Sequence, residues 1–517
     1  MRKLAPASLD WALEHLRRHS DTDKFPIPFE IDVVARRWAN GIRDQLAGKD
    51  LTQHQWHGER KMLVPKDEFS FRNAAQLDPL DAILLAALTL EIGPAIEQKR
   101  DLVSAKRVFS YRFAPTPNGG LFGPDLWDDF WNTSIERATR SSFVLVVDIA
   151  DFYNQISHHS IENQLQRCGV AAPDTRIVMN LLTSQTGSIS KGVPVGPHPS
   201  HLLAEASLIP IDELLLQRGF TFCRYVDDMH IFCDSEQHAK VVLFALAGAL
   251  DQYHKLILNR QKTRVLRSAE FIPLAREKAE DQPINSTEAS VLKVIKKYSA
   301  GPYTPIPVGV LSADDLAALS QVALEEILEA YLNSPERDYI RLRFLLRRLS
   351  QVGVPGAVEF VVAHVSQLLP AFSEVARYLN SASKQYGGSW AVIGDALLAL
   401  LESPIANESE YIQIVLLGLF GRIADLDHIA KLTQRFGTSS ASAQREIVLA
   451  ATVSNADSWL RTIKSNFSRY DPWLRRALVY SARILPKDER KFWLKEIKPL
   501  CDSLELEIAA DCSNTSP

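Results

Sequence analysis

The second half of the chain repeats one kind of pattern. From Leu311 to Leu500, apolar residues recur at helical spacing in one segment after another, and the alternation of a β-strand is almost absent. Three segments resemble one another at roughly 30-residue steps: "IVLLGLFGRIADLDHIAKL" from Ile414, "IVLAATVSNADSWLRTI" from Ile447 and "ALVYSARILPKDERKFWL" from Ala477. Helix pairs at that period predict an α-solenoid of HEAT-like type, in which each pair buries its apolar face on the next. A plain helical bundle is the alternative.

The first half of the chain has a different character. Residues 1 to 140 mix helical patterns with Pro-rich turns, and from Phe143 to Phe271 short apolar runs alternate with helical segments, which indicates an α/β structure. Between Arg276 and Gly309 the chain becomes polar and contains prolines, as expected of a boundary. We therefore predict α/β plus all-α architecture, with an α/β part over 1–275, a linker over 276–310 and a helical part over 311–517.

Composition limits the classes of protein that fit. The 517 residues carry a net charge of -4, which argues against a protein that coats nucleic acid with its whole surface but allows a local basic channel. The five cysteines are scattered without a CxxC pair, as expected of reduced thiols in a cytosolic protein. The N-terminus lacks an apolar core of signal-peptide length, and no run of about 20 apolar residues occurs. These features predict a cytoplasmic protein that is neither exported nor membrane-spanning.

Two segments place carboxylates where strands should end. In "GFTFCRYVDDMHIFCD", apolar residues alternate before Tyr225 and after Asp228, which predicts a β-hairpin whose tip presents Asp227 and Asp228. In "FVLVVDIADFYNQIS", the continuous apolar run Phe143–Val147 predicts a strand buried on both faces, and it ends in Asp148. If that strand pairs beside the hairpin, the carboxylates converge and can hold two divalent cations.

Such a carboxylate set has a known chemistry. Two metal ions about 3.5 to 4 Å apart clamp the attacking and leaving oxygens of an in-line phosphoryl displacement. Mg²⁺ prefers oxygen ligands, so we predict two Mg²⁺ ions, with Mn²⁺ as the alternative metal. The simpler interpretation is solvated Asp residues at strand ends. Two other Asp pairs, Asp128-Asp129 and Asp314-Asp315, lie beside helical patterns and are interpreted as capping or solvated residues.

The motifs and their order resemble those of reverse transcriptases. "VVDIADFYNQI" resembles the first palm motif of that family, and "YVDD", about 80 residues later, resembles its most specific one. Between them, "KGVPVGPHPSHLLAE" resembles the Pro-x-Gly-x-x-x-Ser element, here Pro194, Gly196 and Ser200, which leads into a helix against the template and the incoming nucleotide. Val195 replaces the common Gln and His201 replaces the usual Pro, so this element departs from ordinary template positioning.

The resemblance implies roles for residues outside the carboxylate set. "LILNRQKTRVL" resembles the Asn-x-x-Lys-Thr element, in which Lys262 would protonate the departing pyrophosphate. An exposed lysine at a strand end is the simpler interpretation. Tyr153 matches the aromatic residue that packs under the sugar and excludes a 2′-hydroxyl, whereas Phe152 is expected in the core, unless the two roles are exchanged.

A basic segment precedes the palm motifs. In "QKRDLVSAKRVFSYRF", a fingers region that binds the nucleotide triphosphate is implied by the resemblance, because Arg forks match phosphate oxygens. Arg107 and Arg112 are favoured because Val108 to Phe113 alternates like a strand. For each arginine alone, a solvated charge is the alternative.

The whole chain resembles a narrower group. A fingers and palm domain followed by helical repeats in place of a thumb is similar to the abortive-infection reverse transcriptases, of the AbiK and AbiA kind, of bacteria and their prophages. This resemblance implies antiphage defence and template-independent synthesis from deoxynucleotides. It also implies priming by a protein hydroxyl, single-stranded DNA left covalently attached, a homo-oligomer and a phage or host protein partner.

Two other hypotheses stay open. One is a conventional RNA-templated reverse transcriptase with a dedicated RNA partner, as in retrons. The other is a catalytically idle palm that serves as a scaffold for protein binding.

Overall fold

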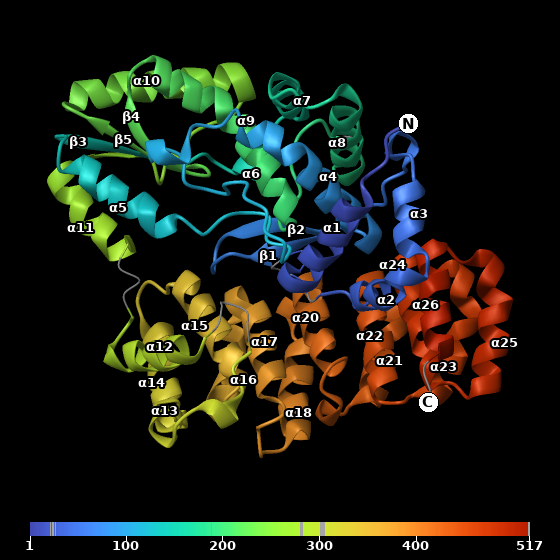
Figure 1. Cartoon of the computed structure of the whole chain (residues 1–517). Helices are drawn as coiled ribbons and strands as arrows, with labels where there is room; N and C mark the ends of the chain where they lie inside the picture. The colour runs from blue at the N-terminus through green and yellow to red at the C-terminus, as the bar shows by residue number, and fades with distance from the viewer. Residues whose placement is uncertain are drawn as a thin grey trace. The chain divides into compact units, whose positions relative to one another are not determined.

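The protein divides into two compact units (Figure 1). The structure is a computed structural model and describes residues 1–20, 22, 25, 27–187, 189–279, 283–299 and 305–514. Unit 1 consists of Met1–Asp23, Ile27–Lys61 and Ala74–Gln282, and unit 2 consists of Lys24–Pro26, Met62–Asn73 and Pro283–Pro517.

The centre of unit 1 is a four-stranded sheet with the strand order β4-β5-β3-β6. Its strands are β3 (Phe143–Val147), β4 (Thr221–Tyr225), β5 (Asp228–Cys233) and β6 (Arg264–Arg267). The predicted apolar strand and the predicted hairpin are both confirmed, because β3 covers the apolar run and β4 pairs antiparallel with β5. β3 lies between β5 and β6 and is antiparallel to both.

Helices cover both faces of this sheet (Figure 1). Helices α5 and α11 contact one face, and α9 and α10 contact the other. The helices of unit 1 are α1 (Pro6–His19), α2 (Phe29–Arg37), α3 (Ile42–Gly48), α4 (Pro79–Glu97), α5 (Trp127–Ala138), α6 (Phe152–Gln155), α7 (His158–Arg167), α8 (Ala172–Gln185), α9 (His198–Gln217), α10 (Glu236–His254) and α11 (Ser268–Ala279).

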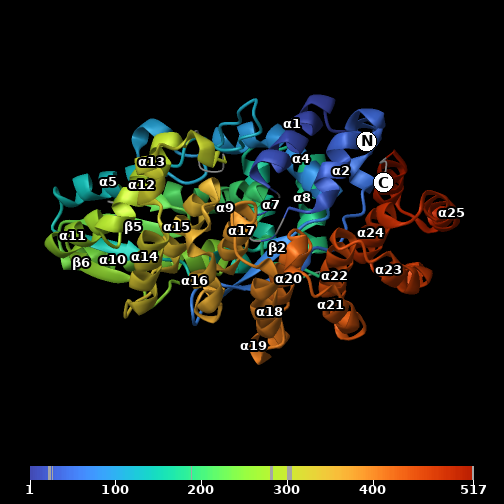
Figure 2. The same ribbon diagram turned by 90° about the horizontal axis from the view of Figure 1, so that it is seen from below.

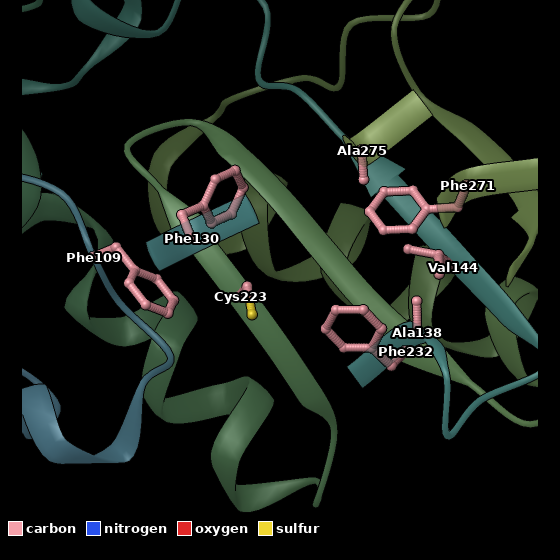
Figure 3. Packing of buried hydrophobic residues seen from close by; sticks show 8 residues of the cluster. All are labelled: Phe109, Phe130, Ala138, Val144, Cys223, Phe232, Phe271 and Ala275. Atoms are coloured by element: carbon pink, nitrogen blue, oxygen red, sulfur yellow. The ribbon is translucent and has the colours of Figure 1, made fainter. Parts of the chain in front are cut away.

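A buried apolar cluster joins α5 and α11 to the sheet (Figure 3). Aromatic rings from both helices pack against small and aromatic side chains of the strands, so the sheet that carries the carboxylates has a rigid support. Its members are Phe109, Phe130, Ala138, Val144, Cys223, Phe232, Phe271 and Ala275.

Helix α4 is long and strongly apolar. This 19-residue helix contains an 18-residue window with a mean hydropathy of 1.6, so it is long and apolar enough to cross a membrane by length and composition. Most of it is buried among other elements of unit 1, including α1 and α9. A buried core helix meets the same criteria, so this pattern alone is weak support for a membrane span.

The hairpin of β1 (Arg60–Pro65) and β2 (Phe71–Gln76) begins and ends in unit 1, while residues 62–73 belong to unit 2. Within unit 2, the Arg337 guanidinium forms an ion pair with Glu68, and the Tyr339 hydroxyl donates to the same carboxylate at 3.0 Å. Arg343 Nη2 donates to the Lys66 carbonyl at 2.9 Å. These contacts attach an early segment of the chain to helix α15 (Tyr339–Val352) and to the residues just before it.

The later part of unit 2 is helical in its described residues, as predicted. Helices α15, α17, α20, α22, α24 and α26 contact one another in that order, and Figure 2 labels the first five of them. The helices are α12 (Ser286–Tyr298), α13 (Ala313–Ala318), α14 (Gln321–Asn333), α15 (Tyr339–Val352), α16 (Val358–Ala363), α17 (Phe372–Ala382), α18 (Trp390–Leu401), α19 (Pro404–Glu408), α20 (Glu410–Phe420), α21 (Ile429–Arg435), α22 (Ala441–Val453), α23 (Asp457–Ile463), α24 (Pro472–Ser481), α25 (Lys487–Ile497) and α26 (Ser503–Asn514). The HEAT-like repeat stays a prediction.

Two segments differ from their sequence-based description. The strand predicted over Val108 to Phe113 is wrong, because the segment forms only isolated bridges and turns at Tyr111, where φ is 42°. The predicted linker 276–310 contains α12, which contacts α14 and α15 of unit 2. The compact units are not divided at the predicted boundaries, because unit 2 includes residues 62–73 and begins again at Pro283. The predicted domains themselves stay a prediction.

Candidate active site

The sheet brings three carboxylates together where β3 ends and β4 turns into β5. Val147, the last residue of β3, pairs with Met229 of β5, so Asp148 follows directly beside Asp228. Tyr225 pairs with Asp228, which leaves Val226 and Asp227 as the two-residue turn between β4 and β5. The turn and the strand end thus project their carboxylates from a hydrogen-bonded sheet.

The turn itself is held in an unusual conformation. Val226 has φ of 54°, a left-handed backbone that β-branched residues rarely adopt. Both backbone polar groups of Val226 have partners: its N–H donates to Ser110 Oγ at 2.9 Å, and its carbonyl accepts from Arg224 Nη1 at 3.0 Å. These two contacts fix the peptide that precedes Asp227.

A buried ion network surrounds these contacts. Arg224 is fully buried and binds the Asp212 carboxylate of α9 with two bonds of 2.7 and 2.6 Å, and it also pairs with Glu205 at 3.1 Å. Glu205 also accepts from Ser110 Oγ at 2.5 Å and from Arg100 Nη2 at 2.7 Å. Burial raises the pKa of Glu205, but the charges of Arg224 and Arg100 outweigh it and hold that pKa below the ordinary value. Because every charge has a partner, removing one would leave another buried and unpaired.

Lys262 lies against the first carboxylate. Its Nζ donates to Asp148 Oδ2 at 2.6 Å, and Asn259 N donates to the Asp148 carbonyl at 2.8 Å. Burial lowers the pKa of Lys262, but the hydrogen bond to Asp148 and the charges of the three Asp residues outweigh it, so the pKa is raised. The lysine therefore keeps its proton at neutral pH.

The carboxylates repel one another. Burial raises the pKa of Asp227 to about 7, and the charges of Asp228 and Asp148 act in the same direction. Lys262 compensates only part of this charge. The donor set is composed of oxygens, and its negative charge is incompletely neutralised, so it fits a hard divalent cation.

An aromatic group lies next to the carboxylates. The Tyr153 hydroxyl is 2.6 Å from His201 Nδ1, and the His201 ring stacks on Tyr111 with 4.0 Å between centroids and 4° between planes. Burial raises the pKa of Tyr153, as do the charges of Tyr111, Glu205 and Asp227, so the hydroxyl stays protonated. Phe152 is 2% exposed and lies in the core.

The segment with Pro194, Gly196 and Ser200 leads into α9. Gly196 has φ of 129°, and a Cβ there would lie against Thr22 Oγ1 and 3.0 Å from the Ala75 carbonyl, so only glycine fits. Pro194 is buried. Ser200 is 1% exposed, and its Oγ has no hydrogen-bond partner among the described residues.

The two arginines predicted to bind triphosphate contact carboxylates of unit 1. Arg107 binds Asp101 with bonds of 2.7 and 2.9 Å. Arg112 is buried, forms an ion pair with Glu97 and donates to the Asp101 carbonyl at 2.8 Å. Their role in nucleotide binding stays a prediction.

A further group of metal-ligand types went unnoticed in the sequence. His57, Asp78 and Asp81 have ligand atoms within 4.8 Å of one another at the start of α4. Asp78 accepts from Leu80 N at 3.0 Å, and Asp81 accepts from His54 Nε2 at 2.8 Å and from His57 N at 2.7 Å. The Asp78 bond caps α4, and the Asp81 bonds attach the segment before the helix to its first turn. No spacing motif marks the group in the sequence.

Comparison with known families agrees with the geometry. The family model described as "Reverse transcriptase (RNA-dependent DNA polymerase)" matches residues 88–289, which include the three Asp residues and Lys262. The prediction of a domain of reverse transcriptase type is therefore confirmed for residues 88–289.

Comparisons with solved structures and with curated proteins provide less information about function than the family model. One similar structure is telomerase from Candida albicans in complex with a TWJ fragment of telomeric RNA, at 12% sequence identity and a TM-score of 0.32. That match covers 67% of this chain and 65% of the telomerase chain. No curated protein matches the sequence.

Proposed function

We propose that unit 1 synthesises DNA from deoxynucleoside triphosphates at a site formed by Asp148, Asp227 and Asp228. The observation that carries this proposal is the convergence of the three carboxylates on β3 and the β4-β5 hairpin inside the matched domain. These residues would hold two Mg²⁺ ions, or Mn²⁺, which when bound stabilise charge on the reacting phosphoryl oxygens.

The neighbouring residues have complementary roles. Lys262 Nζ holds a proton beside Asp148, and in this proposal it gives that proton to the departing pyrophosphate. The Tyr153 ring, held by its contact to His201, packs under the sugar and excludes a 2′-hydroxyl. Arg107 and Arg112 belong to the fingers region that receives the triphosphate, with Pro194, Gly196 and Ser200 on the template side.

The biological role that we propose is abortive infection in the cytoplasm of a bacterium. In this proposal the enzyme is a homo-oligomer, needs no nucleic-acid template and primes synthesis from its own hydroxyl, so single-stranded DNA stays attached. The resemblance of the domain order to that of abortive-infection enzymes supports this, as do the helices of unit 2, interpreted as HEAT-like repeats. His201, where the family usually has Pro, stacks on Tyr111 and supports an altered template side.

A templated reverse transcriptase with a dedicated RNA is the second candidate. The observation that favours it is the family description of residues 88–289, which names an RNA-dependent polymerase. In that case the chain would need an RNA template and primer.

The experiment incubates the pure protein with Mg²⁺ and radiolabelled deoxynucleotides, without primer or template. Denaturing gels are run before and after protease and nuclease treatment, with Asp227→Asn as the inactive control. Label that stays on the protein until nuclease or protease releases it is the expected result. Incorporation only after addition of an RNA template and primer would favour the second candidate. No incorporation in either format would leave an idle palm that serves as a scaffold.

A further inference from the structure

One face of unit 2 gathers arginines from neighbouring helices. Arg343 and Arg347 lie four residues apart on α15 and so share one face of that helix. Arg377 lies on α17, and Arg422 follows the end of α20. Because α17 contacts both α15 and α20, the arginines lie on, or directly after, three adjacent helices.

Their electrostatic neighbours connect these residues. Arg343 faces Arg72, Arg347, Glu374 of α17 and Tyr411 of α20. Glu374 is three residues before Arg377 and shares its helix face. Arg422 faces Arg377 and Glu446. We call the surface around Arg343, Arg347, Arg377 and Arg422 the arginine face.

The arginines of the arginine face form fewer direct ion pairs than other arginines of unit 2, although the carboxylates of Glu374 and Glu446 act on Arg343 and Arg422. Among the described residues, Arg347, Arg377 and Arg422 form no ion pair and no side-chain hydrogen bond. Arg343 donates only to backbone carbonyls, those of Tyr339, Pro370 and Lys66, at 3.0, 3.2 and 2.9 Å. By contrast, Arg461 binds Glu489 with bonds of 3.1 and 3.0 Å, and Arg475 binds Glu505 at 2.7 Å.

Accumulated positive charge of this kind is costly without an anion. Burial lowers the pKa of Arg343, the charge of Glu374 opposes this effect in part, and the charges of Arg72 and Arg347 add to it. Arg377 and Arg422 are exposed, so a ligand can reach them. Guanidinium groups bind phosphate oxygens with two parallel hydrogen bonds, and a row of them matches a ligand with repeated phosphates.

We propose that the arginine face of unit 2 binds the phosphate backbone of single-stranded nucleic acid. The choice of a polynucleotide over an acidic protein segment rests on the proposed function, because the same chain then produces a single-stranded polyphosphate. The structure supplies the cations, their position on or next to three adjacent helices, and, among the described residues, the absence of a direct ion pair to Arg347, Arg377 or Arg422.

The test uses the full chain with Asp227→Asn, so that binding is measured without synthesis. A fluorescent single-stranded DNA of mixed sequence is titrated at several salt concentrations, and anisotropy gives Kd. Addition of Arg347→Gln/Arg377→Gln is expected to weaken binding about tenfold. The slope of log Kd against log salt is expected to fall by about 1.4, since each phosphate contact on a single strand contributes about 0.7.

Matched variants separate the arginine face from net charge and folding. Arg469→Gln/Lys495→Gln removes the same charge from exposed positions elsewhere in unit 2 and is expected to leave the slope unchanged. Arg377→Gln/Arg422→Gln carries the same prediction as the first pair and protects the test against a folding defect in one variant.

Two results would overturn the inference. One is an unchanged Kd and slope in both arginine variants with intact melting curves. The other is poly-glutamate binding as tightly as the oligonucleotide with the same arginine dependence, which would indicate an acidic protein partner. Because no synthesis is involved, binding through the arginine face would stand even if the polymerase assays failed.

Discussion

At the scale of single residues, the carboxylates and their immediate partners determine the chemistry. Asp148, Asp227 and Asp228 could be identified from the sequence because an apolar strand and a hairpin both end in Asp. The placement of Lys262 on Asp148 follows from the segment after α10, where Ile149 bridges Leu258. The bond between Tyr153 and His201 had no sequence signal, because 48 residues separate the two side chains.

The raised pKa of Asp227 predicts how stability depends on pH. Without metal, the folded state holds this proton up to about pH 7, whereas an unfolded carboxyl loses it near pH 4. The folded state therefore binds more protons in this window, and the free energy of unfolding falls as pH rises from about 4 to about 7. A cation binds the ionised carboxylate, so Mg²⁺ should raise Tm more at pH 8 than at pH 6.

Melting curves in EDTA and in Mg²⁺ at both pH values check this prediction. In Asp227→Asn, the Mg²⁺ effect should be small at either pH. An equal Mg²⁺ effect at both pH values in the unmodified chain would argue against Asp227 as a ligand.

Sugar selection should depend on Tyr153. Removal of the ring in Tyr153→Ala opens space under the sugar, so the preference for deoxynucleotides over ribonucleotides should decrease. Tyr153→Phe keeps the ring and loses only the contact to His201, and it should retain most of the preference. The ratio of kcat/KM for the two nucleotide types measures the effect, and an unchanged ratio in Tyr153→Ala would point to Phe152 or another residue.

At the scale of elements, the β4-β5 hairpin depends on a loop residue that the sequence did not single out. Ser110 accepts from Val226 N and donates to Glu205, so Ser110→Ala leaves a buried N–H without a partner. We expect a loss of about 1 to 3 kcal/mol in the free energy of unfolding, together with lower nucleotide incorporation.

Ser207→Ala is the matched control, because this fully buried hydroxyl donates only to the Ala204 carbonyl of its own helix. Its loss should cost about 0.5 kcal/mol or less. Urea denaturation measures both, and equal losses would show that Ser110 has no special role in the turn.

The elements that the sequence predicted and missed differ in a physical way. Strand β3 and the hairpin have strong local patterns, and they form as predicted. The Val108 to Phe113 segment also alternates, but its neighbours allow only single bridges, at Val108 to Arg224 and at Phe113 to Phe122. Whether an alternating segment pairs as a strand depends on residues that are distant in the sequence, so the local pattern alone does not predict it.

At the scale of the whole molecule, the two units interleave along the chain. Residues 62–73 belong to unit 2 although they precede most of unit 1. A change in composition along the sequence indicates a domain boundary only when it extends over a long segment. The assignment of the twelve residues 62–73 to unit 2 could therefore not be predicted from composition. The helices of the later chain could be predicted because apolar residues recur at helical spacing in many successive segments.

The contacts of Glu68 predict how this segment is held. The Glu68 carboxylate forms an ion pair with Arg337 and accepts a hydrogen bond from the Tyr339 hydroxyl. Glu68→Ala should therefore release residues 62–73 from α15. Hydrogen exchange of their amides should accelerate, while β3 and β5 keep their protection. Glu336→Ala removes a nearby carboxylate with no ion pair among the described residues and serves as control. Unchanged exchange in Glu68→Ala would show that other contacts hold the hairpin.

The most direct test of the central claim is nucleotide incorporation by Asp227→Asn. It is compared with the unmodified chain and with Asp234→Asn, which removes an exposed carboxylate just after β5. Incorporation is measured with Mg²⁺ in both the unprimed and the RNA-templated format, and melting curves verify folding. The carboxylate site predicts incorporation at background in Asp227→Asn and near-normal incorporation in Asp234→Asn. Substantial synthesis by a folded Asp227→Asn protein would contradict it.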